Sequence, residues 1–124
     1  MNSGRGDIMP PGIKLKKIID NLQLSILVEG NLETDIKGGY TGDLLSDVMV
    51  NSDASQIWVT IQTHINIIAI AILKELTVII LTQGKNPDPE TVEKVKTEKV
   101  TILSTPLPKL EIVGRLYQMG IKGI

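Results

Sequence analysis

Apolar residues recur along the chain with two different periods, and the helical period comes first. An apolar stripe at positions i, i+3, i+4 and i+7 predicts a helix over Ile13–Leu22. Extended segments are expected at Leu24–Val28 and around Thr34–Lys37, where the chain runs into a Gly38-Gly39 turn of positive φ. A short helix over Leu44–Val50 follows.

From residue 57 onward, short apolar strands alternate with helices. Strands that are apolar on both faces indicate a parallel sheet covered on both sides by helices. We therefore expect an α/β fold with three layers, in which a mostly parallel sheet has helices on both faces. The predicted segments are, in order, strand Ile57–Ile61, helix His64–Leu73, strand Thr77–Leu81, helix Pro89–Glu98 (with Asp88 as its N-cap and a Glu90–Lys94 ion pair), strand Val100–Leu103 and helix Pro108–Met119.

The helix predicted over His64–Leu73 has no polar face, so it needs a second surface to cover it. One possibility is the last helix, which offers Leu110, Val113, Leu116 and Tyr117. The other, which we favour, is a second copy of the chain in a homodimer. The candidate interface residues are then Ile65, Ile68, Ala69 and Ile72.

The 124 residues suit one domain, which we place at residues 13–124 after a flexible arm at residues 1–12. A net charge of −1 gives no global field to attract nucleic acid or an anionic membrane. No apolar run approaches the ~18 residues of a membrane span, and no signal-peptide pattern is present. We expect a cytoplasmic protein without nucleic-acid or membrane partners.

Several kinds of chemistry are excluded by composition. The chain has no cysteine and one histidine, so thiolate catalysis and the common Cys and His metal sites are ruled out. The P-loop, G-x-S-x-G and H-E-x-x-H motifs do not occur. We therefore expect no catalytic residues, no metal and no cofactor. An acid–base pair of His64 with Asp43 or Asp47 is the one enzymatic alternative.

Polar side chains follow the carboxyl ends of the predicted strands, which is where open α/β sheets bind ligands. Hydroxyls and amides at helix N-termini suit an anion. Capping of the helices is the competing interpretation for Thr63, Ser104 and Thr105. The candidate ligand-binding residues are Asp35, Gly38, Gly39, Asp43, Thr63, His64, Thr82, Gln83, Gly84, Ser104 and Thr105.

The stretch from Thr34 to Met49 resembles the DRTGG domain, whose name comes from an Asp-Arg-Thr-Gly-Gly signature. Asp35, Gly38 and Gly39 match that signature, while Ile36 and Lys37 replace the Arg and the Thr. The later runs 58–64, 82–84 and 102–105 are also similar to stand-alone members of the family, so the resemblance covers roughly residues 13–121.

The resemblance implies a fold similar to the N-terminal domain of HPr kinase/phosphorylase. It also implies kinship with an accessory module of phosphotransacetylases and of pyrophosphatases that carry CBS domains. We therefore expect a non-catalytic regulatory module, homodimeric, that senses a small phosphorylated or nucleotide-like ligand, docks on a metabolic or redox enzyme, or does both. The alternative is an interaction or scaffold protein that binds no ligand.

Overall fold

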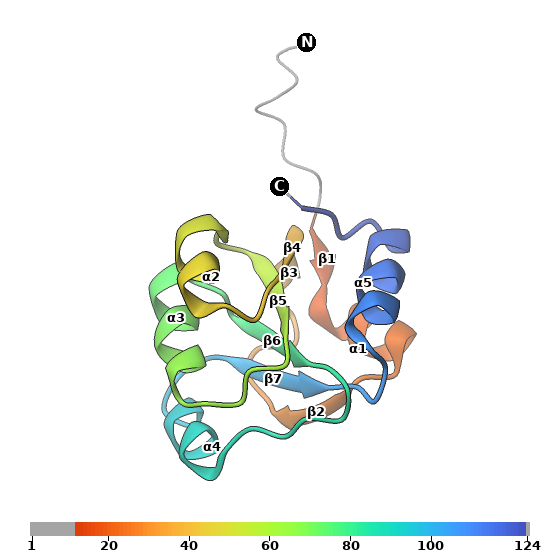
Figure 1. Ribbon diagram of the computed structural model, residues 1–124. Helices are drawn as coiled ribbons and strands as arrows, with labels where there is room; N and C mark the ends of the chain where they lie inside the picture. Colours follow the sequence, from red (N-terminus) through yellow and green to blue (C-terminus); the bar gives the residue numbers. More distant parts are fainter. Residues whose placement is uncertain (1–11, 124) are drawn as a thin grey trace.

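The computed structural model describes residues 12–123, so the flexible arm expected at residues 1–12 lies almost wholly outside the described residues. The described chain builds a three-layer α/β fold around a five-stranded sheet, as the sequence predicts (Figure 1). All neighbouring strands are parallel except the pair β2–β7 at one edge. The strand order is β2 (Ser25–Val28), β7 (Thr101–Ser104), β6 (Val78–Leu81), β5 (Gln56–Thr60) and β4 (Gly38–Thr41).

Helices cover both faces of this sheet. One face carries α1 (Leu15–Leu22) and α5 (Lys109–Gln118). The opposite face carries α2 (Leu45–Asn51), α3 (Asn66–Lys74) and α4 (Pro89–Val95), and Figure 1 shows the two groups on either side of the strands. Successive side chains of a strand point to opposite faces. The sheet therefore divides the aliphatic core into two layers.

The first predicted helix begins two residues later than expected. Ile13–Lys14 instead forms a short strand, β1, which pairs antiparallel with β3 (Asp35–Ile36). The backbone amide of Leu15 then donates to the carbonyl of Thr34 at 2.9 Å, which holds the start of α1 against this small sheet. Tertiary pairing therefore decides this helix boundary, and the apolar stripe of the helix likewise begins only at Leu15.

The turn expected at Gly38-Gly39 is wrong, because both glycines lie in strand β4 and neither has a positive φ. A Cβ placed on Gly39 would lie 3.2 Å from Cγ2 of Ile121. The Gly39 amide also donates to the carbonyl of Lys122 at 3.0 Å. Because Gly39 has no side chain, the C-terminal segment can therefore pack closely against the edge of the sheet.

The remaining helices and strands agree with the predicted ones to within a few residues at their ends. The largest difference is in α4, which ends at Val95 because the amides of Thr97 and Glu98 donate to carbonyls three residues back, in the case of Glu98 to Val95 at 3.0 Å. The ion pair of α4 joins Lys96 to Glu93 at 2.9 Å, in place of the expected Glu90–Lys94 pair.

The apolar helix α3 packs between α2 and α4, so the alternative in which α5 covers it is wrong. Ile68 is completely buried in the core and has no surface to offer to another chain. Ile72 and Leu73 keep 43% and 67% of their surface exposed, so the outer side of α3 is apolar and open to solvent. None of the helices within residues 12–123 has the length and apolar character needed to cross a membrane.

Candidate functional site at the carboxyl ends of the strands

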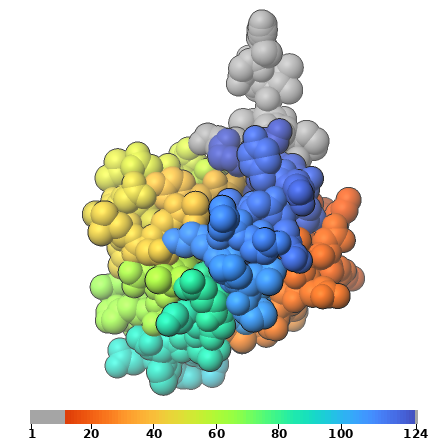
Figure 2. Space-filling model, turned by 45° about the vertical axis from the view of Figure 1, so that its right-hand side comes forward, coloured from red at the N-terminus to blue at the C-terminus, as the bar shows by residue number. Residues whose placement is uncertain are grey.

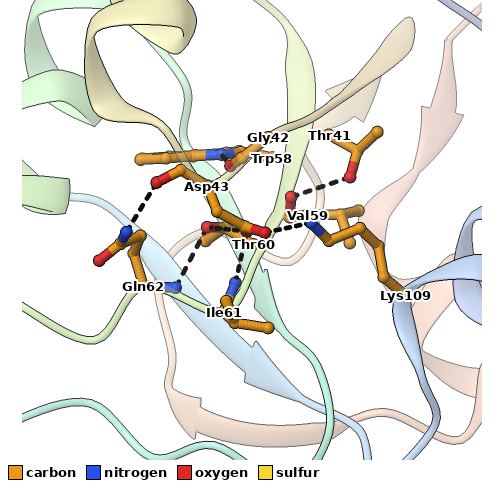
Figure 3. A network of polar contacts seen from close by, with 9 residues as sticks. All are labelled: Thr41, Gly42, Asp43, Trp58, Val59, Thr60, Ile61, Gln62 and Lys109. Carbon is orange, nitrogen blue, oxygen red and sulfur yellow. Dashed lines mark hydrogen bonds and ion pairs between the residues drawn. The ribbon is translucent and has the colours of Figure 1, made fainter.

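Asp43 connects three segments at the carboxyl edge of the sheet (Figure 3). It follows β4, and its Oδ1 accepts hydrogen bonds from the Thr60 hydroxyl at the end of β5 and from the Ile61 amide, each at 2.9 Å. Its Oδ2 accepts from the ammonium of Lys109, the first residue of α5 and 66 residues away in the chain. We call Asp43, Thr60, Ile61 and Lys109 the strand-end site.

The loop that carries Asp43 is fixed by two further side chains. The amide nitrogen Nε2 of Gln62 donates to the Asp43 carbonyl at 2.6 Å. The indole N–H of Trp58, which is fully buried, donates to the Gly42 carbonyl at 3.0 Å. A buried indole N–H needs a partner. The single tryptophan of the chain therefore positions the backbone on which the Asp43 carboxylate is held.

The Asp43 carboxyl stays ionised at neutral pH. Burial alone would raise its pKa, but the hydrogen bonds from Lys109, the Ile61 amide and the Thr60 hydroxyl outweigh burial and hold the pKa below the ordinary value of 3.8. The side chains of Asp43 and Lys109 are about one-third exposed, at 30% and 32%, so a solute can reach the ion pair.

Capacity for hydrogen bonding is unevenly distributed within this ion pair. A carboxylate offers about four acceptor positions, and three donors already point to that of Asp43. A lysine ammonium has three donors, and the bond to Asp43 uses one of them. The first amides of α5 likewise lack partners within the helix. The spare groups of the strand-end site are therefore donors, which suit an anion.

Asp47 belongs to a separate cluster on α2. Its Oδ2 accepts from the Tyr40 hydroxyl at 2.5 Å, and its Oδ1 accepts from Asn51 at 2.9 Å. The bond from Tyr40, followed by that from Asn51, lowers the pKa of Asp47. The same bond, with burial and the charge of Asp47 acting in the same direction, raises the pKa of the Tyr40 phenol.

His64 is exposed and acts at the start of α3. Its Nδ1 accepts from the backbone amide of Asn66 at 3.1 Å, so the imidazole caps the helix. The carboxylates of Asp43 and Asp47 are bound by the other groups described above. The acid–base pair considered from the sequence is therefore not formed, and the contact that His64 makes is with the backbone at the start of α3.

The predicted residues that follow β6 and β7 tie two loops to each other. Thr82 to Lys85 form a turn in which Gln83 and Gly84 have φ of 58° and 68°, and the Lys85 amide donates to the Thr82 carbonyl at 3.1 Å. The Gln83 amide donates to Leu107, and the Gly84 amide to Thr105, each at 3.0 Å. These backbone bonds set the position at which α5 begins.

The hydroxyls expected as caps differ in their roles. Thr105 Oγ1 accepts from the Leu107 amide at 3.2 Å, just before α5. Thr63 contributes its backbone carbonyl, which accepts from the Thr91 hydroxyl at 2.8 Å and from the Asp88 amide at 3.0 Å. Thr82, which the sequence suggests as a ligand contact and not as a cap, is completely buried, and its hydroxyl has no hydrogen-bond partner among residues 12–123.

Three predicted residues lie away from the carboxyl edge. Gly38 and Gly39 pair with Gln56 and Ile57, the first residues of β5, so they lie at the amino end of the sheet. Asp35, in β3, forms an exposed ion pair with Lys14 at 3.1 Å. The expected grouping of these residues with Asp43 is therefore wrong, because the glycines lie inside a strand and not in a loop after it.

Lys109 is the residue of the strand-end site that the sequence analysis does not identify. A cation in the first turn of a helix is opposed by the helix dipole, so an acidic partner nearby is favourable. That signal indicates a partner for Lys109 but does not identify Asp43, since the two residues are distant in the chain. Among residues 12–123, no group of three His, Cys, Asp or Glu side chains is arranged to hold a metal ion.

No family model and no curated protein matches this sequence. A similar solved structure is that of the CBS and DRTGG domains of the regulatory region of Clostridium perfringens pyrophosphatase, in complex with the activator diadenosine tetraphosphate. The TM-score is 0.70 and the sequence identity 19%, over 94% of this chain and 53% of that one. This chain thus spans about half of the other, and the expected resemblance to a DRTGG-containing protein is confirmed at the level of the fold.

Proposed function

We propose that this chain is a non-catalytic regulatory module that senses a small phosphorylated ligand at the strand-end site. The observation that carries the proposal is the Lys109 ammonium, which stands at the N-terminus of α5 on the carboxyl edge of the sheet with donors to spare. A phosphate there would accept from this ammonium and from the first amides of α5, where the helix dipole also favours negative charge.

Asp43 acts in this proposal as an internal counter-ion. It neutralises Lys109 while the site is empty, and an incoming phosphate competes with it for the ammonium. Binding would therefore loosen the tie between the loop after β4 and α5. A partner protein could recognise the changed position of this loop or of α5, and ligand binding would thereby affect the partner. The other predicted residues at this edge, Thr63, Gln83 and Ser104, would contact the rest of the ligand.

A regulatory role is favoured over a catalytic one by the state of the acidic groups. The pKa values of Asp43 and Asp47 are both lowered, so each is a weak base at neutral pH. The similar pyrophosphatase region is regulatory and binds diadenosine tetraphosphate. That region supports the choice of a phosphorylated or nucleotide-like ligand for this chain, and of a metabolic enzyme as the protein that the module regulates.

A second copy of the chain is the partner that we propose for the outer side of α3, with Ile65, Ala69 and Ile72 as contacts. The alternative function, an interaction protein without a ligand, is favoured by the same exposed apolar surface and by two further exposed apolar side chains, Leu44 just before α2 and Val50 within it, at 68% and 74%. Sedimentation of a monomer at micromolar concentration would count strongly against this alternative.

The proposal is tested by titrating the protein with inorganic phosphate while backbone amide resonances are recorded. We expect saturable shifts at Ile61, Lys109 and Leu110, and at least a tenfold loss of affinity in Lys109→Met. Lys109→Arg, which keeps the charge, should retain binding. Lys99→Met is the matched control, because Lys99 is exposed just before β7, at the amino end of the sheet. Equal weakening by both Met variants would overturn the proposal.

A further inference from the structure

We propose that the strand-end site selects an anion that carries a proton of its own, of the hydrogen phosphate type, and rejects sulfate. The inference rests on the proposed function and concerns the acidic half of the ion pair, the Asp43 carboxylate. In Figure 2 the blue surface of the chain around the start of α5 adjoins the yellow-orange surface of the chain after β4. These are the segments that Lys109 and Asp43 join, so an anion bound to Lys109 would lie beside a carboxylate.

The two carboxylate oxygens of Asp43 have different surroundings. Oδ1 accepts from the Thr60 hydroxyl and from the Ile61 amide, each at 2.9 Å. Among residues 12–123, the Lys109 ammonium is the one donor to Oδ2. When a phosphate competes for that ammonium, Oδ2 loses this donor while Oδ1 keeps both of its own. The anion would therefore face a carboxylate oxygen that has unused capacity to accept a hydrogen bond.

The Asp43 carboxylate is held where the anion would bind. Turning it away would break both bonds to Oδ1, and the backbone is fixed by Gln62, whose Nε2 donates to the Asp43 carbonyl at 2.6 Å. The side chain is only 30% exposed, so water compensates incompletely for a lost donor. An anion without a proton would be repelled by Oδ2 and would leave this oxygen unsatisfied.

At neutral pH the Asp43 carboxyl is an acceptor and carries no proton. Burial acts to raise its pKa, but the bonds from Lys109, Ile61 and Thr60 outweigh burial and hold the pKa below its ordinary value. A bound anion and Oδ2 can share a proton only if one of them supplies it. A ligand that brings its own proton binds without the cost of protonating this carboxyl.

Hydrogen phosphate and sulfate have the same shape and the same charge, and they differ in this proton. Every inorganic phosphate ion retains at least one P–OH group at neutral pH, and that group can donate to Oδ2. Sulfate has no such group. A phosphate monoester has a second pKa of about 6, so roughly one-tenth of it retains the proton at pH 7. The site should therefore prefer inorganic phosphate to a simple monoester, and either of these to sulfate.

The test compares inorganic phosphate, methyl phosphate and sulfate at pH 7 and equal ionic strength. The backbone amide shifts of Ile61, Lys109 and Leu110 in the full chain report binding. A site that forms a specific hydrogen bond discriminates strongly against a ligand that lacks the matching group. We expect methyl phosphate to bind about tenfold more weakly than inorganic phosphate, as its protonated fraction requires, and sulfate to bind more weakly still.

Asp43→Asn tests the source of this selectivity. If the amide oxygen keeps the bonds from Thr60 and Ile61, the amide nitrogen takes the place of Oδ2 and presents a donor. The affinity for sulfate should then rise more than that for phosphate, and the two affinities should agree to within about threefold. Asp47→Asn is the matched control, because Asp47 belongs to the separate cluster on α2, and it should keep the wild-type ratio.

The outcomes separate this inference from the proposed function. Equal affinities of the wild type for phosphate and sulfate would overturn the inference and leave the proposed function standing, because both ions would still bind at Lys109. Methyl phosphate that matched inorganic phosphate would also overturn it. So would a preference for phosphate that survived in Asp43→Asn or disappeared equally in Asp47→Asn. Absence of saturable phosphate shifts in the wild type would overturn the proposed function, and the inference with it.

Discussion

Asp43 and Lys109 form an ion pair across the carboxyl edge of the sheet, and they join the loop after β4 to the first residue of the last helix. The pair is supported on the acidic side by Thr60 and the Ile61 amide. It places a cation where the dipole of α5 would otherwise oppose it. Both the stability of this edge and its proposed response to phosphate depend on this contact.

The first prediction concerns Asp43→Asn. The variant loses the ion pair but keeps an oxygen that can accept from Thr60 and Ile61, so we expect a loss of about 1–3 kcal/mol in the free energy of unfolding at pH 7. Urea denaturation measures it. The same variant removes the group that competes with phosphate for Lys109, so its phosphate affinity should rise. A variant that was less stable and also bound phosphate more weakly would contradict the counter-ion role.

A second prediction concerns how the stability lost in Asp43→Asn depends on pH. The pKa of Asp43 is lower in the folded protein than in the unfolded chain, so the folded state binds fewer protons in acid. The stabilisation is fully present above the unfolded value of about 3.9 and is lost as the pH falls through the folded pKa. The stability difference between wild type and Asp43→Asn should therefore shrink as the pH falls below about 3.9 and through the lowered pKa of the folded protein. Asp47 is present in both proteins, and its titration cancels in the comparison.

Two glycine substitutions should have opposite effects. Gly39→Ala brings a methyl group against Ile121, and we expect it to destabilise the protein by about 1 kcal/mol or more. Gly114→Ala, in the middle of α5 with open space around it, should stabilise the protein by about 0.5–1 kcal/mol. Thermal unfolding of both variants is the measurement. Stabilisation by Gly39→Ala would show that the C-terminal segment does not press on β4.

The buried Thr82 hydroxyl gives a further prediction. Because this hydroxyl has no partner among the described residues, Thr82→Val should be neutral or should stabilise the protein by about 1 kcal/mol. Thr91→Val is the control, because the Thr91 hydroxyl is buried and donates to Thr63, so its loss should cost about 1 kcal/mol. If Thr82→Val were the more damaging change, the hydroxyl would have a partner that its surroundings do not reveal.

Local patterns predicted most of the fold. The apolar stripe of α1 and the runs that become β5, β6 and β7 are visible in the sequence because burial on one face or on two leaves a direct periodic signal. The order of the strands in the sheet leaves no such periodic signal. Because the sequence does not give the strand order, it could not show that α5 and α3 lie on opposite faces of the sheet.

The candidate site was predictable in part, for the same reason. The edge of the sheet and Asp43 followed from the general position of ligands in α/β folds. Lys109 was missed because its partner is distant in the chain, and Gly39 was misplaced because a glycine required for close packing looks the same in sequence as one required for a turn. Both errors concern tertiary contacts, which composition and spacing do not record.

Native mass spectrometry of protein freshly purified from cells, with wild type beside Lys109→Met, tests the central claim most directly. It reports the number of subunits and any bound small molecule together. We predict a wild-type dimer that carries the mass of a phosphorylated small molecule, and a Lys109→Met protein of the same subunit number without it. If neither protein carried a bound small molecule, that result would contradict a phosphate-sensing site at Lys109 and would favour the interaction protein that binds through α3.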